Sequence, residues 1–316
     1  MPTKILHKPD EDFIPTKVIL FVLFLAMLWG GNAVSLKIGL QKFAPLASAG
    51  LRFLIGLFLI AGWALSHGIS LKPQPREYLP LFLIGMLFTI QIACFNWGTN
   101  LTRASRAVVM INTYPLFVAV IAHFLVPGDR LTGRKTVGLI VAFGGILFVF
   151  RDNLVGGDAG LMTGDILTLL SGFQLGLLIV LTNRLIQHID SYRLLTSQML
   201  IGVPVFFLLS GIFEGKAGYG FSYPALLAIL YQGVVVAGFC FVAWTLVLKH
   251  YRPSRLSVLF FTTPLWGLTL SHFFLGDPIT VGLGIGAGLV ALGIYIVNRS
   301  PREQSNLRKV QNLPKV

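Results

Sequence analysis

Long apolar runs separated by short polar gaps make up most of the chain. A hydrocarbon core of about 30 Å requires about 20 apolar residues per helix, and runs close to that length recur along the sequence. The pattern predicts five transmembrane helices before a polar gap and five after it. Their expected limits are 18–40, 46–66, 79–98, 104–126, 136–150, 165–186, 194–213, 225–248, 256–275 and 279–298.

The same pattern divides the chain into two helical units. The first run is too long for the apolar core of a signal peptide and lacks a small-residue cleavage site, so we expect it to stay in the mature protein. The fold class predicted is all-α and integral to a membrane. The expected parts are an N-terminal tail at 1–17, a first unit at 18–150, a linker at 151–164, a second unit at 165–298 and a basic tail at 299–316.

The second unit repeats the first in sequence, which is the most informative pattern in the chain. The first two helices of each unit match only faintly, so the repeat is supported for three helices and inferred for the rest. At an offset of 149 residues, and of 148 after a one-residue gap, the matched pairs include Arg103 and Arg252, Thr113 and Thr262, Pro115 and Pro264, His123 and His272, Asp129 and Asp277, and Gly145 and Gly293.

An odd number of helices in each unit has a topological consequence. The second copy must enter the membrane from the opposite side, so we predict ten transmembrane helices arranged as two inverted five-helix repeats. Inverted repeats give two related structures that open to opposite faces, which is the geometric basis of alternating access around a midplane site. This symmetry favours transport as the function.

Composition supports a lipid environment. Hydrophobic residues make up 55% of the chain and charged residues 12%, which no water-soluble domain of this length would carry on its surface. The net charge of +13 comes from Lys and Arg in short gaps and tails rather than on one face, which argues against a nucleic-acid partner. Cys94 and Cys240 stand alone in apolar runs, so we expect no metal site and no cofactor.

Basic residues also predict the orientation, because cytoplasmic loops retain Lys and Arg. With a cytoplasmic amino terminus, most basic residues fall on the cytoplasmic side. We therefore expect a multi-pass protein of the cell's inner membrane with both termini in the cytoplasm. The basic residues left on the outer side are Lys37, Lys42, Arg103, Arg106, Arg151 and Lys216.

Several short motifs occur in a specific order. Leu28-Trp29-Gly30-Gly31-Asn32 leads to Lys37, Ala47 leads to Arg52-Phe53, the fourth and ninth helices centre on prolines, and Asp129 and Asp277 each precede a glycine-rich helix. In this the chain resembles the ten-helix branch of the drug/metabolite transporter superfamily, which has two EamA-type domains. The resemblance implies export or exchange of amino acids or similar metabolites through a cavity lined by helices one, three, four, six, eight and nine.

Polar residues within a bilayer either bond between helices or face a wet cavity. Both alternatives stay open for each candidate. We rank the neighbourhood of Pro115 and Pro264 first, as helix breaks that could gate the cavity, because a proline ring frees a backbone carbonyl. On the expected cavity helices the polar candidates are Asn32, Gln91, Asn96, Asn112, Tyr114, Gln174, Tyr231, Gln232, Thr262 and Thr263.

Tryptophans and buried bases are the other binding candidates. Trp29, Trp244 and Trp266 could stack on an apolar part of a substrate, with interfacial anchoring as the alternative. Lys37 could attract a carboxylate. The alternative, preferred for both Lys37 and Arg52, is that the side chain extends toward the outer headgroups.

Acidic residues are expected only in tails, loops and helix ends. Coupling to sodium or protons usually requires a carboxylate within the membrane, so we hypothesise facilitated diffusion or exchange, or coupling through His123 or His272. The last helix has a small-residue face at Gly282, Gly284, Gly286 and Gly288. Packing within the chain explains that face better than a homodimer does.

Two rival functions remain. An integral-membrane enzyme that modifies lipids would need paired acids, a metal cluster or a histidine box, and the sequence shows none of these patterns. A nucleotide-sugar or phosphorylated-metabolite exchanger would need several convergent Lys or Arg groups. The expected partners are therefore a small, zwitterionic or weakly charged substrate and the bilayer, with no enzymatic activity.

Overall fold

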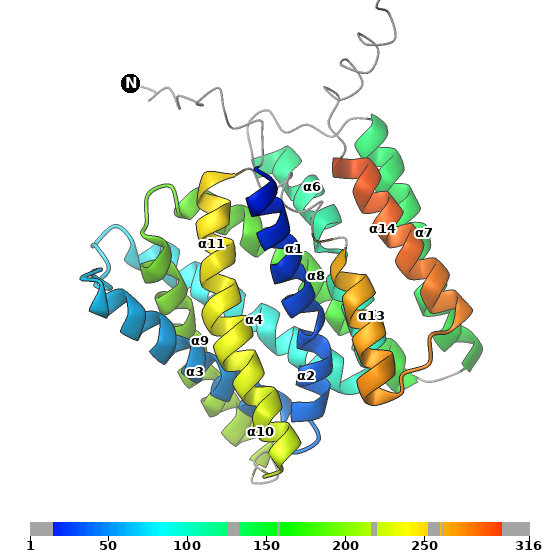
Figure 1. The fold of residues 1–316 in the computed structure, drawn as a ribbon, viewed down its shortest axis with the longest axis horizontal. Coiled ribbons are helices and arrows are strands. Elements are labelled where there is room, and N and C mark those ends of the chain that lie inside the picture. The colour runs from blue at the N-terminus through cyan, green and yellow to red at the C-terminus, as the bar shows by residue number, and fades with distance from the viewer. Residues whose placement is uncertain are drawn as a thin grey trace, which may run out of the picture.

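The computed structural model describes residues 15–125, 133–156, 159–215, 220–251, 260 and 262–298. The regular secondary structure of these residues is helical (Figure 1). The helices are α1 (Thr16–Gly30), α2 (Asn32–Gly39), α3 (Pro45–Ser66), α4 (Tyr78–Leu101), α5 (Ala104–Ile111), α6 (Tyr114–Leu125), α7 (Gly133–Gly156), α8 (Ala159–Leu185), α9 (Ser191–Phe213), α10 (Tyr223–Leu230), the π-helix η3 (Tyr231–Cys240), α11 (Phe241–His250), α13 (Thr262–Leu275) and α14 (Val281–Asn298).

Ten apolar segments follow one another along the described chain, in the order that the sequence predicts. Seven are long enough to cross a membrane, and three shorter apolar segments lie in α7, α13 and α14. The first span consists of α1 and α2, the fourth of α5 and α6, and the eighth of α10, η3 and α11. The prediction of an all-α, ten-helix membrane protein is confirmed.

Two spans are interrupted near their middle. The first changes direction at Gly31, between α1 and α2, and the fourth is interrupted at Asn112 and Thr113, between α5 and α6. Pro115 is the second residue of α6 and has no N–H to donate to the carbonyl of Ile111, so the preceding helix cannot continue through it. Turn hydrogen bonds, such as those from the N–H of Gly31 to Met27 O and from the N–H of Thr113 to Met110 O, connect the helices across these interruptions.

Helix α7 continues to Gly156 and α8 begins at Ala159, so both extend into the expected linker at 151–164. No proline stands in that segment to stop a helix. Close packing on α4 also favours the earlier start of α8, because a Cβ on Gly164 would lie 2.6 Å from the backbone N of Thr102.

The packing of the helices shows the repeat directly. If each helix is replaced by its counterpart in the other half, the contact between α1 and α13 becomes one between α8 and α6. The contact between α3 and η3 likewise becomes one between α9 and α4. All four contacts are observed. The contacts of α3 with α9 and of α7 with α14 map onto themselves. Each half has five spans, so the two halves are inverted repeats, interlocked rather than laid side by side.

Helices α7 and α14 form one edge of the molecule and run antiparallel (Figure 1). Gly293 lies against Gly138 and Ala142, whereas Gly145 lies against Gly286. The expected packing of the last helix through its glycines is thus observed at Gly286. A Cβ added at Gly284 or at Gly288 would meet no other atom within 4 Å.

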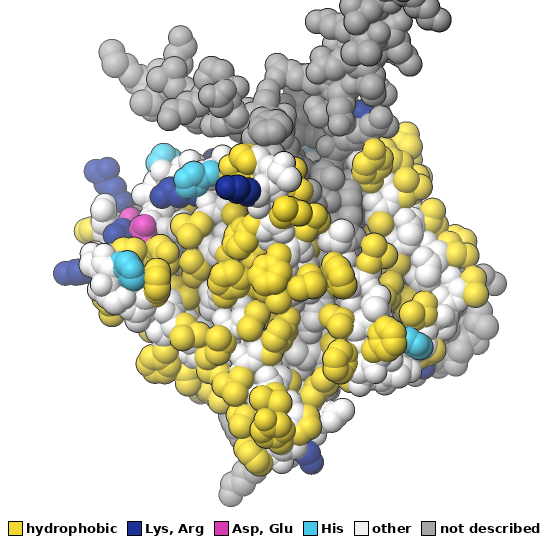
Figure 2. Space-filling view, in the orientation of Figure 1, with side chains coloured by type: hydrophobic (Ala, Val, Ile, Leu, Met, Phe, Trp, Pro, Cys, Tyr) yellow, Lys and Arg dark blue, Asp and Glu magenta, His cyan; other side chains and the backbone are white. Residues whose placement is uncertain are grey.

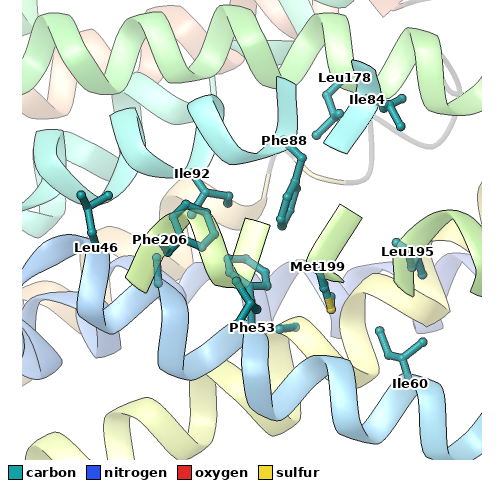
Figure 3. Packing of buried hydrophobic residues seen from close by; sticks show 13 residues of the cluster. Leu46, Phe53, Ile60, Ile84, Phe88, Ile92, Leu178, Leu195, Met199 and Phe206 are labelled. Atoms are coloured by element: carbon teal, nitrogen blue, oxygen red, sulfur yellow. The ribbon is translucent and has the colours of Figure 1, made fainter. Parts of the chain in front are cut away.

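Apolar side chains cover the middle of the surface, as a lipid environment requires. Figure 2 shows hydrophobic side chains across the visible face, with basic side chains gathered mainly near one end. Large exposed apolar residues include Phe58, Phe124 and Phe273, which are 70%, 76% and 77% exposed. Inside, α3, α4 and α9 meet at Phe53, Phe88 and Phe206 (Figure 3).

Candidate functional site

A cavity of about 180 Å³ lies between the two halves. One buried water needs roughly 10–15 Å³, so the cavity has room for a small organic molecule. Its wall includes residues of α3 and α9 in addition to the six spans that the family resemblance implied. The polar side chains at the wall are Asn32, Arg52, Gln91, Asn112, Tyr114, Thr182, Gln198, Gln232, Thr245 and Thr263.

The cavity extends from mid-depth toward one end of the bundle. Its wall includes Thr182 near the end of α8, Leu248 near the end of α11, and Leu195 near the start of α9. We call this the cavity end. Lys17, at the start of α1, and Lys249, at the end of α11, lie there as well.

Hydrogen bonds join the helices at the opposite end. The Glu214 carboxylate accepts bonds from the backbone N–H groups of Leu46 (2.8 Å) and Ala47 (3.1 Å) at the start of α3. The Asp277 carboxylate accepts one from the N–H of Ser105 (3.0 Å) at the start of α5. Each acid stabilises the positive end of a helix from another part of the chain.

Lys37 and Arg106 complete this end. Lys37 Nζ donates to the carbonyl oxygens of Thr99, Asn100 and Thr102 at distances of 3.0, 2.8 and 2.7 Å. Arg106 Nε lies 3.0 Å from Oδ2 of Asp165. We call the five charged side chains Lys37, Arg106, Asp165, Glu214 and Asp277 the polar clasp, because they tie together helices of both halves.

Arg52 occupies the wall at mid-depth. Nη1 donates to Oε1 of Gln232 (3.2 Å) and Nη2 donates to Oδ1 of Asn96 (3.0 Å). The side chain is only 2% exposed, so it does not extend to the headgroups, and that expectation is wrong for Arg52. Its Nε is buried and has no hydrogen-bond partner among the residues that the structure describes. Of the wall residues that the structure describes, Arg52 alone carries a full charge.

Four aromatic rings form a second part of the wall. Trp29 contacts Phe260 at a centroid distance of 5.5 Å, Phe241 at 6.0 Å and Trp244 at 6.2 Å. Trp244 and Phe260 are 4.7 Å apart and nearly perpendicular. We call these residues the aromatic cluster. It offers a large apolar face to anything held in the cavity.

Eight residues singled out from the sequence as side chains that could meet a substrate lie at the wall: Trp29, Asn32, Gln91, Asn112, Tyr114, Gln232, Trp244 and Thr263. Within the described chain, the buried Oδ1 of Asn32 and Oγ1 of Thr263 have no hydrogen-bond partner. Gln91 Nε2 donates to Ser171 Oγ (2.8 Å), and Asn112 Nδ2 donates to the Val108 carbonyl (2.8 Å). Compared with Gln91 and Asn112, the side chains of Asn32 and Thr263 therefore have more hydrogen-bonding capacity left for a ligand.

Other residues singled out from the sequence lie away from the described wall. Asn96 orients Arg52 and donates to the Pro45 carbonyl (2.7 Å), and Tyr231 donates to the Leu28 carbonyl (2.6 Å). Trp266 is 42% exposed on the outer surface. The remaining ones are Lys37 in the clasp, Gln174 beside Cys94, Thr262 in the first turn of α13, Pro115 in α6, and Pro264, whose side chain lies outside the described residues.

Sequence reasoning missed Gln198, Thr182 and Thr245 as wall residues and misplaced Arg52. Arg52 is the eighth residue of α3, roughly 10 Å along the axis from its start at 1.5 Å per residue. This distance from the start of the helix was a signal in the sequence that the guanidinium could remain within the bundle. The amides on two other helices that hold it inside were not visible as partners in the sequence.

Comparisons with known proteins agree with this architecture. The profile of the EamA-like transporter family matches residues 16–151 and 162–299. The chain is 28% identical to the "Uncharacterized transporter YoaV" of Bacillus subtilis (strain 168), over 89% of this chain and 96% of the relative. It is 27% identical to a "Probable amino-acid metabolite efflux pump" of Escherichia coli (strain K12), over 87% and 92%. A solved crystal structure has a TM-score of 0.68 at 19% identity, covering 89% of this chain and 97% of its own, which supports the fold.

Proposed function

Because the chain belongs to the EamA-like transporter family, we propose that it carries an amino acid or a similar zwitterionic or weakly charged metabolite by alternating access around the central cavity. The chain is a multi-pass membrane transporter, and the family is one of transporters rather than enzymes. Substrate class, direction and orientation are the proposed parts.

The observation that carries the proposal is a cavity lined by residues of both inverted halves, with the polar clasp joining the helices at the opposite end of the bundle. In an inverted repeat, each half can adopt the conformation that the other half has. Opening the clasp and closing the cavity end would expose the same wall to the opposite side. The mid-span interruptions at Gly31 and at Asn112 give the helices places to bend.

The chemistry of the wall supports a substrate of low net charge. One guanidinium, several neutral amides and hydroxyls and the aromatic cluster suit a molecule with a single ionised group or a zwitterion. A phosphorylated sugar or nucleotide sugar usually needs several converging cations, so this alternative has less support. The names of the Escherichia coli and Salmonella typhimurium relatives, "Probable amino-acid metabolite efflux pump", support export of amino acids.

We place the cavity end in the cytoplasm of a cell with an inner membrane, with both termini on that side. Lys17, Arg193 and Lys249 lie at that end, in line with the retention of basic residues in the cytoplasm. Single cysteines introduced in a variant lacking Cys94 and Cys240 test this. Ser70→Cys is expected to react with a membrane-impermeant reagent from the cytoplasmic side and Gln41→Cys from the outer side. The reverse pattern would contradict the orientation.

Purified protein in liposomes tests the function directly. We expect uptake of at least one labelled amino acid above the level of empty liposomes, and no comparable uptake of sugar phosphates or nucleotide sugars. Transport of sugar phosphates alone would favour the exchanger instead. A proton gradient is expected not to drive uphill uptake. If it does so in the His123→Gln, His272→Gln double variant, coupling uses another group and our hypothesis of facilitated diffusion or exchange fails.

A further inference from the structure

We infer that Arg52 is the subsite for the carboxylate of the substrate, and that the substrate is a monocarboxylate with an apolar or aromatic body. This inference rests on the proposed function, since it assumes that the cavity takes up the transported molecule. It adds the group that the cavity recognises and the residue that recognises it.

The first observation is a buried cation with no anion beside it among the described residues. Both hydrogen-bond acceptors of Arg52 are neutral amides, and the described acids that pair with an arginine, Asp165 and Glu77, pair with Arg106 and Arg193 instead. A buried charge without a counter-charge is costly, above all within a membrane. Binding of an anion next to the guanidinium would therefore be favourable, and the space next to it is the cavity.

The second observation is that the guanidinium is held in place from several directions. Asn96, on α4, is itself fixed by its bond to the Pro45 carbonyl, and Gln232 lies in the π-helix η3, a type of irregularity frequent at functional sites. The guanidinium carbon lies 4.6 Å from the centre of the Phe53 ring. Such a fixed group loses little freedom when a carboxylate binds, which favours affinity.

The third observation fixes the class of ligand. The described wall has one cationic side chain, which matches one carboxylate better than a doubly charged phosphate. From Arg52, ring contacts lead to the aromatic cluster: Phe53 contacts Phe241 at 5.9 Å, and Phe241 contacts Trp29 at 6.0 Å. A ligand with its carboxylate at Arg52 would thus lay its apolar body along aromatic rings.

Matched acid and amide probes test the inference with the purified full-length chain. The pairs are phenylacetate with phenylacetamide and L-phenylalanine with L-phenylalaninamide, and the readouts are the rise in Tm on ligand addition and uptake into liposomes. We expect each acid to bind at least roughly tenfold more tightly than its amide, because a charge-assisted bond is replaced by a neutral one.

Gln232→Glu is the sharpest variant, because it offers Arg52 an internal carboxylate in place of the substrate's. Gln232 Nε2 has no partner within the described chain, so the change removes no hydrogen bond there and folding should be preserved. We expect the acid-over-amide preference to disappear in Gln232→Glu and in Arg52→Gln, and to persist in reduced form in Arg52→Lys. Gln187→Glu, at an exposed site in the turn just after α8, adds the same charge elsewhere and is expected to keep the preference.

The outcomes separate the two proposals. Equal binding of acid and amide to the unaltered protein, or an unchanged preference in Gln232→Glu, overturns the Arg52 subsite even if amino acids are transported. Acid-selective stabilisation without any uptake overturns the transport proposal and leaves the subsite standing. Neither stabilisation nor uptake by any probe overturns both.

Discussion

The Asp165 carboxylate, in the second turn of α8, lies 3.0 Å from the Nε of Arg106 on α5, and the two side chains are 0% and 5% exposed. A third helix takes part, because the Thr102 hydroxyl at the end of α4 donates to the same carboxylate at 2.7 Å. The pair accounts for the unexpected outer-side Arg106, since its charge is neutralised within the protein. It also places an acid that we expected at a helix boundary inside a membrane span.

Replacing Asp165 with Asn is expected to lower the free energy of unfolding by about 3–5 kcal/mol, because the buried Arg106 guanidinium loses this carboxylate as its counter-charge. Thermal unfolding in detergent measures the change. The double variant Arg106→Gln, Asp165→Asn is expected to recover part of the loss, since both charges are gone. A single Asp165→Asn variant with the Tm of the unaltered protein would contradict this account of the pair.

Lys37→Met tests whether Lys37 closes the clasp or binds substrate. Removal of its three bonds to carbonyls at the end of α4 is expected to cost about 1–3 kcal/mol of stability. The acid-over-amide preference of ligand binding is expected to stay as it is. A loss of that preference without a fall in Tm would instead indicate that Lys37 binds the carboxylate of the substrate.

Two neighbouring glycines of α7 provide a matched pair for the packing of the last helix. A Cβ on Gly145 would lie 2.6 Å from the Gly286 carbonyl oxygen, whereas one on Gly144 would meet nothing within 4 Å. Gly145→Ala is therefore expected to destabilise the protein by about 1–3 kcal/mol through overpacking. Gly144→Ala is expected to be neutral or stabilising by up to about 1 kcal/mol, because Ala favours helix. Equal Tm changes for the two variants would argue against close packing of α7 on α14.

Glu77, just before α4, is expected to make stability depend on pH. Burial alone would raise the pKa of this carboxyl, but the backbone N–H of Gln74 and the Arg193 guanidinium together outweigh it and lower the pKa below its usual value. A lowered pKa in the folded state means that the pair stabilises the protein above the unfolded-state pKa and that this stability is lost as the pH falls through the folded-state pKa.

Thermal unfolding of the unaltered protein and of Glu77→Gln, measured from pH 7 down to pH 3, checks this expectation. The variant is expected to have the lower Tm at pH 7, and the difference is expected to shrink at the acid end, where Glu77 becomes protonated. A difference that stays constant over this range would show that the ionised pair contributes little.

The sequence predicted the spans well because a bilayer imposes one strong requirement on each of them. A segment such as 46–66 must be apolar over its whole length to lie in lipid, so its limits are visible in the chain, and the structure begins α3 at Pro45 and ends it at Ser66. The limits of α8 were less visible. Its first residues pack against α4 at Gly164, and such a contact between distant segments leaves no local pattern.

The roles of the charged residues were the least predictable feature of the candidate site. Lys37 and Arg52 look alike in the sequence, as single bases within apolar runs. One bonds to the end of α4 and the other is held by Asn96 and Gln232 at the cavity wall. Which of the two faces the cavity depends on the rotation and depth of several helices, and hydropathy does not record these.

By itself, the sequence determined that the chain is an all-helical membrane protein of ten spans with two inverted halves, because hydrophobic length and internal repetition are local properties of the chain. Only the tertiary structure decided which side chains surround the cavity, that Arg106 pairs with Asp165, and that Arg52 has no acid beside it within the described chain. Burial and partnership depend on residues far apart in the chain, 180 positions for Arg52 and Gln232, and packing in three dimensions sets them.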